Sequence, residues 1–98
     1  MEIAGVVKRV AMVRSGEGVN GMWVSREFSI MTTGDYSREV AFVCVGKDMV
    51  NIISGINEGK TVIVRFVPES RMKKDETGWW TSLRCVAIQV AEKIAINN

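Results

Sequence analysis

Residues 40–56 read VAFVCVGKDMVNIISGI, and two kinds of hydrophobic pattern meet in this stretch at Gly46. Before the glycine, apolar residues occupy both alternating faces of an extended run, which indicates a strand covered on both sides. After it, the apolar positions recur at the spacing of one helical face, and an aspartate stands where a helix cap is expected. We therefore predict a strand over about Ser37 to Val45 and a helix of two to three turns from Asp48 to about Ile56.

Four further extended runs lie on either side of this strand and helix. They run from Ile3 to Val13, from Trp23 to Thr32, from Thr61 to about Met72 and from Trp79 to about Glu92. Gly5 interrupts the first run, and a glycine inside a strand often marks a bulge or the close approach of another backbone. The glycine-rich segment Ser15–Gly21 predicts a flexible loop. Pro68 cannot donate to a β ladder, so it indicates an edge position or a bulge in the fourth run.

The predicted order of elements is three strands, one helix and two strands. Five strands with a single helix between the third and the fourth is the element order of the OB-fold, a partly open Greek-key barrel. Its ligand face lies across the second and third strands and is flanked by the loops after the first and fourth strands. We therefore predict an all-β protein, a five-stranded OB-fold barrel with one short helix, and a length of 98 residues predicts a single domain over 1–98.

The composition argues against several classes of function. The chain has no His, which removes the usual general base and every Ser-His or Cys-His catalytic arrangement. The two cysteines, Cys44 and Cys85, are far apart inside apolar runs, have no zinc-type spacing and are interpreted as small core residues. No pair of carboxylates has a spacing that suggests acid and base catalysis. We therefore expect a protein that is not an enzyme and that has no cofactor and no metal.

Charge and hydropathy limit the cellular location and the kinds of partner that we expect. The start of the chain does not resemble a signal peptide, and no apolar run approaches the roughly 20 residues that span a bilayer. We therefore expect a cytoplasmic, reduced protein without a membrane partner. The balance of 13 Lys and Arg against 11 Asp and Glu gives a net charge of +2, so any basic site for nucleic acid must be local.

The stretch from about Val40 to Lys73 resembles the bacterial single-stranded DNA-binding protein family. The segments that carry the resemblance are Phe42–Lys47, the helical segment to Gly59, Lys60–Val64, Glu69–Arg71 and, for the last strand, Gly78–Val86. The chain is also similar in length and layout to the primosomal replication protein of the same superfamily. A family of small uncharacterised OB-fold proteins from Bacteroides-type bacteria is more similar still, through Met1-Glu2-Ile3, Trp23 and Gly78-Trp79-Trp80.

This resemblance implies sequence-tolerant binding of single-stranded DNA in replication, recombination or repair, with RNA as a second candidate ligand. It also implies a homodimer or homotetramer built through the first strands. At positions where the DNA-binding family carries stacking aromatics, however, this sequence has Glu39, Val45 and Lys73. An OB-type protein-interaction or assembly module without nucleic-acid binding is therefore the alternative interpretation.

Aromatic and basic residues on the predicted strands and loops supply the candidate binding site, because single-strand binding needs flat side chains for the bases and cations for the phosphates. Trp79 and Trp80 are adjacent in a strand and face opposite sides, so at most one fills the barrel interior; the other either stacks on a base or packs under a loop or subunit contact. Trp23 is either a stacking platform or a plug at the barrel end. Acidic residues interleave with the cations, which leaves a mixed solvated surface as the alternative. The predicted nucleic-acid-binding residues are Trp23, Tyr36, Arg38, Arg65, Arg71, Lys73, Lys74, Trp80 and Arg84.

Two strands are apolar on both faces. The third strand has Ala41, Val43 and Val45 opposite Val40, Phe42 and Cys44, and the first has Val6, Val10 and Met12 opposite Ile3, Val7 and Val13. A barrel buries one of these faces, so the other is either covered from outside or exposed as an apolar patch. A second copy of the chain is the simplest cover. We therefore expect at least a dimer, with the first strand and a bulge near Gly5 in the contact.

Overall fold

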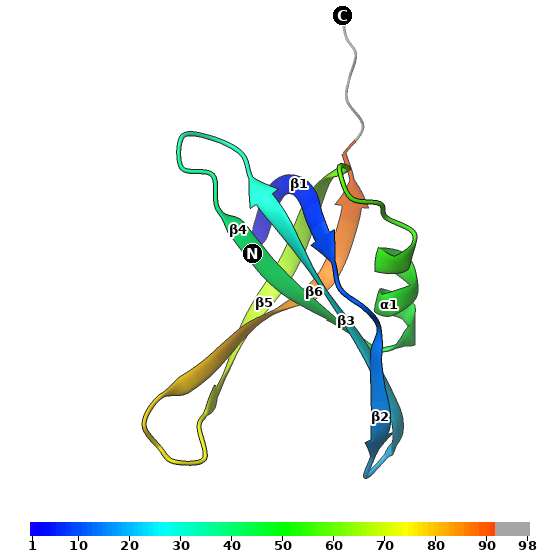
Figure 1. The fold of residues 1–98 in the computed structure, drawn as a ribbon, viewed down its shortest axis with the longest axis vertical. Coiled ribbons are helices and arrows are strands. Elements are labelled where there is room, and N and C mark those ends of the chain that lie inside the picture. The colour runs from blue at the N-terminus through cyan, green and yellow to red at the C-terminus, as the bar shows by residue number, and fades with distance from the viewer. Residues whose placement is uncertain (92–98) are drawn as a thin grey trace, which may run out of the picture.

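The structure, a computed structural model, describes residues 1–91. Over this range the elements are β1 (Glu2–Val10), β2 (Arg14–Gly18), β3 (Gly21–Thr32), β4 (Glu39–Val45), α1 (Lys47–Ser54), β5 (Thr61–Met72) and β6 (Trp79–Val90). Five of these strands close a ring, in which β1 pairs with β5, β5 with β6, β6 with β4, β4 with β3 and β3 again with β1. The predicted OB-fold barrel, with its helix between the third and fourth strands of the ring, is confirmed (Figure 1).

The glycine-rich segment after β1 differs most from the predicted fold. It was expected to be a flexible loop over Ser15–Gly21, but it forms the strand β2, which pairs with the first residues of β3. The prediction was wrong because it treated the glycines as loop formers. Gly16 instead lies beneath the indole of Trp23, three of whose ring atoms are within 3.0 Å of where a Cβ would stand. The resulting β2–β3 hairpin extends beyond the barrel (Figure 1).

A bulge bends β1, but not at Gly5. The register between β1 and β3 shifts between Val7 and Arg9. A bulge adds one residue to a strand and so reverses the side to which the following residues point. Val10 therefore packs against the core on the same side as Val7, and its predicted place on one face with Val6 is wrong. Gly5 instead marks the close approach of another backbone, the second of the two predicted possibilities. A Cβ at this position would overlap the carbonyl oxygen of Met31.

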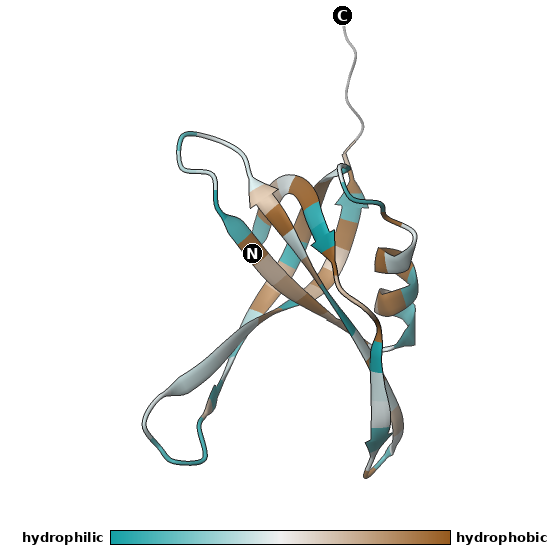
Figure 2. Cartoon of the chain, in the orientation of Figure 1, coloured by the Kyte–Doolittle hydropathy of each residue, from teal (hydrophilic) through white to brown (hydrophobic). Residues whose placement is uncertain are grey.

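The core fills the ring with residues that alternate along its strands, together with Ile53 of α1. It consists of Val7, Phe28, Ile30, Phe42, Cys44, Ile53, Val62, Val64 and Cys85. Phe28 and Phe42 are directly paired across β3 and β4, with ring centroids 5.3 Å apart. Both cysteines are buried free thiols, as predicted. The hydrophobic residues recur along the barrel strands and on the helix that packs beside them (Figure 2).

The helix begins one residue before and ends two residues before its predicted limits. Its N-cap is Gly46, with no capping side chain, so the capping role predicted for Asp48 is wrong and that aspartate lies in the first turn. Val50 and Ile53 are buried against the barrel, whereas Ile52, which was predicted on the same apolar face, is exposed. No helix within residues 1–91 is long and apolar enough to cross a membrane.

The last two strands leave the barrel as a long hairpin. β5 has its predicted bounds, and β6 ends at Val90; the predicted end at Glu92 lies outside the described residues. Pairing of β5 with β1 extends only to Arg65, so Pro68 lies on a free edge, as predicted. Beyond it, β5 and β6 pair with each other as far as Met72 and Trp79. This hairpin and the β2–β3 hairpin extend from the same end of the barrel and diverge (Figure 1).

The close approach at Gly5 can be tested by adding one methyl group. Gly5→Ala forces β1 away from the Met31 carbonyl, and such overpacking typically costs about 1 to 3 kcal/mol. We expect urea denaturation to show a loss of stability of this size. Gly78→Ala is the matched control, because no atom lies within 4 Å of its Cβ position, and its stability should stay within about 0.5 kcal/mol of the parent. Equal midpoints for the two variants would contradict the described β1–β3 packing.

Candidate nucleic-acid interface

The strand registers define one continuous outer face across β3, β4, β6 and β5. Phe42 and Cys44 point into the core, so Val43 points outward, and it lies beside Arg84 in the pairing of β4 with β6. Carrying this alternation through the registers gives the residues that we call the outer face. They are Arg14, Gly16, Trp23, Ser25, Glu27, Ser29, Met31, Glu39, Ala41, Val43, Val45, Val67, Glu69, Arg71, Trp80, Ser82 and Arg84.

Trp23 stands on this face at the β2–β3 hairpin. Its side chain is 45% exposed and lies outside the buried cluster. The indole rests on Gly16 of the neighbouring strand, which gives the ring a supporting surface on one side. Trp23 therefore does not plug the barrel, and its ring is available as a platform on the outer face.

Trp80 occupies the corresponding place on the β5–β6 hairpin. It is 66% exposed, it is paired with Arg71, and the Nζ of Lys73 lies 4.8 Å from its ring centroid, within cation–π range. Trp79 pairs with Met72 on the opposite side of the hairpin, as the alternation predicted, and is 61% exposed. Neither ring enters the barrel interior, because this part of the hairpin lies beyond the barrel.

The acidic residues in the middle of the face are largely engaged. Arg9 contacts Glu39 at 3.0 Å, and the hydroxyl of Ser29 donates a 2.6 Å hydrogen bond to the same carboxylate. That hydrogen bond, together with the charges of Arg9 and Lys8, lowers the pKa of Glu39 below its usual value. Arg84 similarly lies 3.5 Å from Glu69. The centre of the face is therefore close to charge balance.

The remaining cations lie toward the hairpins. Arg14 belongs to β2, Arg71 to the far part of β5, and Lys73 directly follows that strand. Between them, Ala41, Val43 and Val45 of β4 make an apolar floor. An apolar floor with one exposed indole at each hairpin and cations near both suits the flat bases and charged backbone of a single strand.

The predicted site residues lie in three parts of the molecule. Trp23, Arg71, Trp80 and Arg84 lie on the outer face, with Lys73 over Trp80 and Lys74 in the adjoining turn. Tyr36, which is 84% exposed, and Arg38 lie in the β3–β4 loop, at the end of the barrel opposite the two hairpins (Figure 1). Arg65 lies where β5 pairs with β1, and its guanidinium contacts Glu2 at 3.7 Å.

Two contributors to the outer face are absent from the predicted set. Arg14 is one of them, and its place on this face follows from β2, a strand that the sequence did not predict. The floor residues of β4 are the others; their alternation with Phe42 and Cys44 predicts that they share one face, but the cover predicted for an apolar face of this kind was a second copy of the chain. Arg26 points inward, as alternation with Phe28 requires, and there it donates hydrogen bonds to the Ala11 carbonyl and the Ser54 hydroxyl.

The barrel and its flanking hairpins place the chain in the OB-fold class. It belongs to the family described as "Domain of unknown function (DUF3127)", whose model matches residues 2–89. No curated protein sequence matches the chain.

Solved structures with a similar fold include the mitochondrial single-stranded DNA binding protein Rim1 of S. cerevisiae. Its TM-score is 0.70 at 15% sequence identity, over 92% of this chain and 91% of that one. The small single-stranded DNA-binding protein of Streptomyces coelicolor has a TM-score of 0.54 at 17% identity, over 93% of this chain and 92% of that one. At these identities the likeness shows the fold. The resemblance to small proteins of Bacteroides-type bacteria stays a prediction.

The hydrogen bond of Ser29 predicts how Glu39 titrates. A carboxyl whose pKa is lowered by folding stabilises the protein above its unfolded pKa, and this stabilisation is lost as the pH falls through the folded pKa. Ser29→Ala should therefore raise the pKa of Glu39 and weaken the acid-side pH dependence of stability. NMR titration of the side-chain carboxyl carbons measures the shift. Thr77→Ala is the control, because it removes the hydrogen bond that lowers the pKa of Asp75 and should leave Glu39 unchanged; an unmoved Glu39 in the Ser29 variant would contradict the assignment.

Proposed function

We propose that the protein is a non-enzymatic, sequence-tolerant single-stranded DNA-binding protein whose outer face holds the strand. The observation that carries the proposal is the pair of exposed tryptophans, Trp23 and Trp80, on the two hairpins that flank one sheet face. Each stacked base contributes about 1 to 3 kcal/mol in such sites. The names of the two structural neighbours, both single-stranded DNA-binding proteins, support the same ligand class.

Within this proposal, bases stack on the two indoles and lie on the apolar floor between them. Arg14, Arg71 and Lys73 contact the phosphates, with Lys74 at the turn of the β5–β6 hairpin adding to the same field. Stacking and apolar contact read no base edges, so sequence tolerance follows from the chemistry of the face. Tyr36, Arg38 and Arg65 would then contact the DNA only if it continued around the barrel beyond the outer face.

We propose that the protein acts in DNA replication, recombination or repair in the cytoplasm. A single OB-fold domain binds the nucleic acid, and RNA is the second candidate ligand. The exposed Glu27 and the ion-paired Glu39 and Glu69 on the same face oppose a continuous phosphate track. They support the competing function, a protein-interaction module without nucleic-acid affinity. The two functions differ in their response to oligonucleotide and to salt.

We further propose that copies of the chain associate as a homodimer or homotetramer through the outside of β1 and β5. Ala4 and Ile63 are paired there and point away from the core, with Val6 next along β1. These three side chains form an apolar strip beside the Glu2–Arg65 ion pair. A two-fold contact would let the strip cover itself.

Fluorescence titration with oligo(dT) tests the binding proposal. We expect quenching of tryptophan emission and weaker binding at higher salt, because released counterions drive phosphate contacts. Trp80→Ala should weaken binding about 5- to 150-fold, the equivalent of one stacked base. Trp79→Ala, on the opposite side of the same hairpin, is the matched control and should bind like the parent. Absence of binding at tens of micromolar oligonucleotide would overturn the proposal in favour of the interaction module.

Light scattering at micromolar concentration tests the association. We expect a mass of at least twice the 10.9 kDa of one chain. Ile63→Lys places a charge on the apolar strip and should reduce the mass toward that of the monomer. Met12→Lys, at an exposed position outside the strip, should leave the larger mass unchanged. A monomeric parent protein would contradict the association, and an unchanged mass for the Ile63 variant would place the contact elsewhere.

A further inference from the structure

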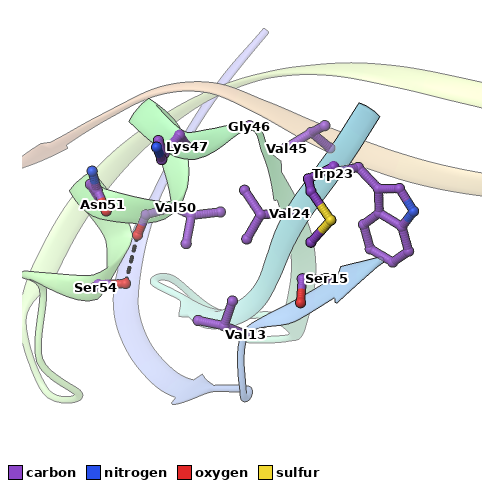
Figure 3. A pocket seen from close by; sticks show the side chains of 11 residues that line it. Val13, Ser15, Trp23, Val24, Val45, Gly46, Lys47, Val50, Asn51 and Ser54 are labelled. Atoms are coloured by element: carbon purple, nitrogen blue, oxygen red, sulfur yellow. Dashed lines mark hydrogen bonds between the residues drawn. The ribbon is translucent and has the colours of Figure 1, made fainter. Parts of the chain in front are cut away.

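A pocket of about 770 Å³ lies between the β2–β3 hairpin and α1, at the point where β4 ends (Figure 3). Val13 and Val24 line it from the side of the hairpin, and Val50 lines it from the helix. Lys47 and Asn51 stand on the helical wall (Figure 3). The pocket is thus largely apolar, with an ammonium and a carboxamide on one side.

The pocket is continuous with the outer face. Trp23 and Val45 belong to that face and also line the pocket. In Figure 3, the indole of Trp23 lies on the side of β3 away from the helix, so the interior of the pocket is the space between this platform and α1. A DNA strand that continues from the indole of Trp23 across the end of β4 therefore reaches the pocket next.

The polar groups of the pocket are matched to a nucleotide. The hydroxyl of Ser54 is already engaged, since it donates to the Val50 carbonyl and accepts from Arg26. Among the described residues, the side chains of Asn51 and Lys47 have no hydrogen bond or ion pair within the chain. A carboxamide can both donate to and accept from the edge of a base, and an ammonium binds phosphate.

We propose that this pocket takes one unstacked nucleobase, together with its sugar, from the strand held on the outer face. The proposal rests on the proposed function and adds a distinct subsite to it. The base lies against Val24 and Val50, the Asn51 amide meets its edge, and Lys47 contacts the adjoining phosphate. A volume of this size falls within the range of small-ligand sites and exceeds what a base alone requires, which leaves room for the sugar.

The test fills the pocket from β2. Ser15 lines the pocket, and the ring of a Ser15→Phe variant should occupy the space of the base. We expect oligo(dT) binding to weaken roughly 5-fold or more, which is the lower end of the affinity lost with one base contact. Val19→Phe is the matched control, because Val19 is exposed at the turn of the same hairpin, does not line the pocket and carries no charge, and its affinity should be that of the parent. Asn51→Ala, at an exposed helical position, should also weaken binding and serves if the phenylalanine variant does not fold. In NMR spectra of the parent, the amides of Val24 and Asn51 should shift on addition of oligo(dT).

The outcomes separate this subsite from the binding function. If the parent binds oligo(dT) and Trp80→Ala weakens that binding, while Ser15→Phe and Asn51→Ala bind normally and the pocket amides do not move, the subsite is overturned and the proposed function stands. If the parent binds no oligonucleotide, both fail together. If Ser15→Phe changes the oligomeric mass and leaves the affinity unchanged, the pocket holds a protein chain, and the base subsite is likewise overturned.

Discussion

The barrel depends on the place where β4 and β6 meet. These strands run parallel, and their paired residues are Val43 and Arg84. The next residue on each strand is a cysteine, and both thiols are buried in the core. One contact between strands therefore serves two surfaces: inside, it completes the hydrophobic cluster, and outside, it joins the sheet of β3 and β4 to the β5–β6 hairpin. Without it the outer face would be two separate strips.

The hairpins obey a different constraint from the barrel. A strand inside the ring has one buried side and one solvated side, whereas a two-stranded ribbon beyond the ring has no core on either side. This difference explains why Trp79 and Trp80 are both largely exposed although they point in opposite directions. It also explains why aromatic residues can stand on these ribbons without adding to the core. The barrel holds the two ribbons, and the ribbons present the indoles.

Local patterns in the sequence were sufficient for the elements whose side chains meet the core. The bounds of β5, the inward side of Phe42 and Cys44, and the opposite directions of Trp79 and Trp80 all follow from alternation with a period of two. Features set by a neighbouring strand were not predictable in this way. The strand β2 exists through its pairing with β3, and the bulge in β1 is seen only against the register of β3. Likewise, the division of the predicted basic residues between two ends of the barrel depends on where loops emerge in space.

Trp23 and Gly16 lie opposite each other on paired strands, and the indole rests on the glycine. Any other residue at position 16 would put a Cβ into the space of the ring and tilt it away from the sheet. The orientation of the ring is thus determined by two residues, Gly16 and Trp23, which are seven positions apart in the sequence. To move this platform to another OB-fold protein, a designer would have to graft both positions together, because the tryptophan alone specifies a side chain but not the direction in which it faces.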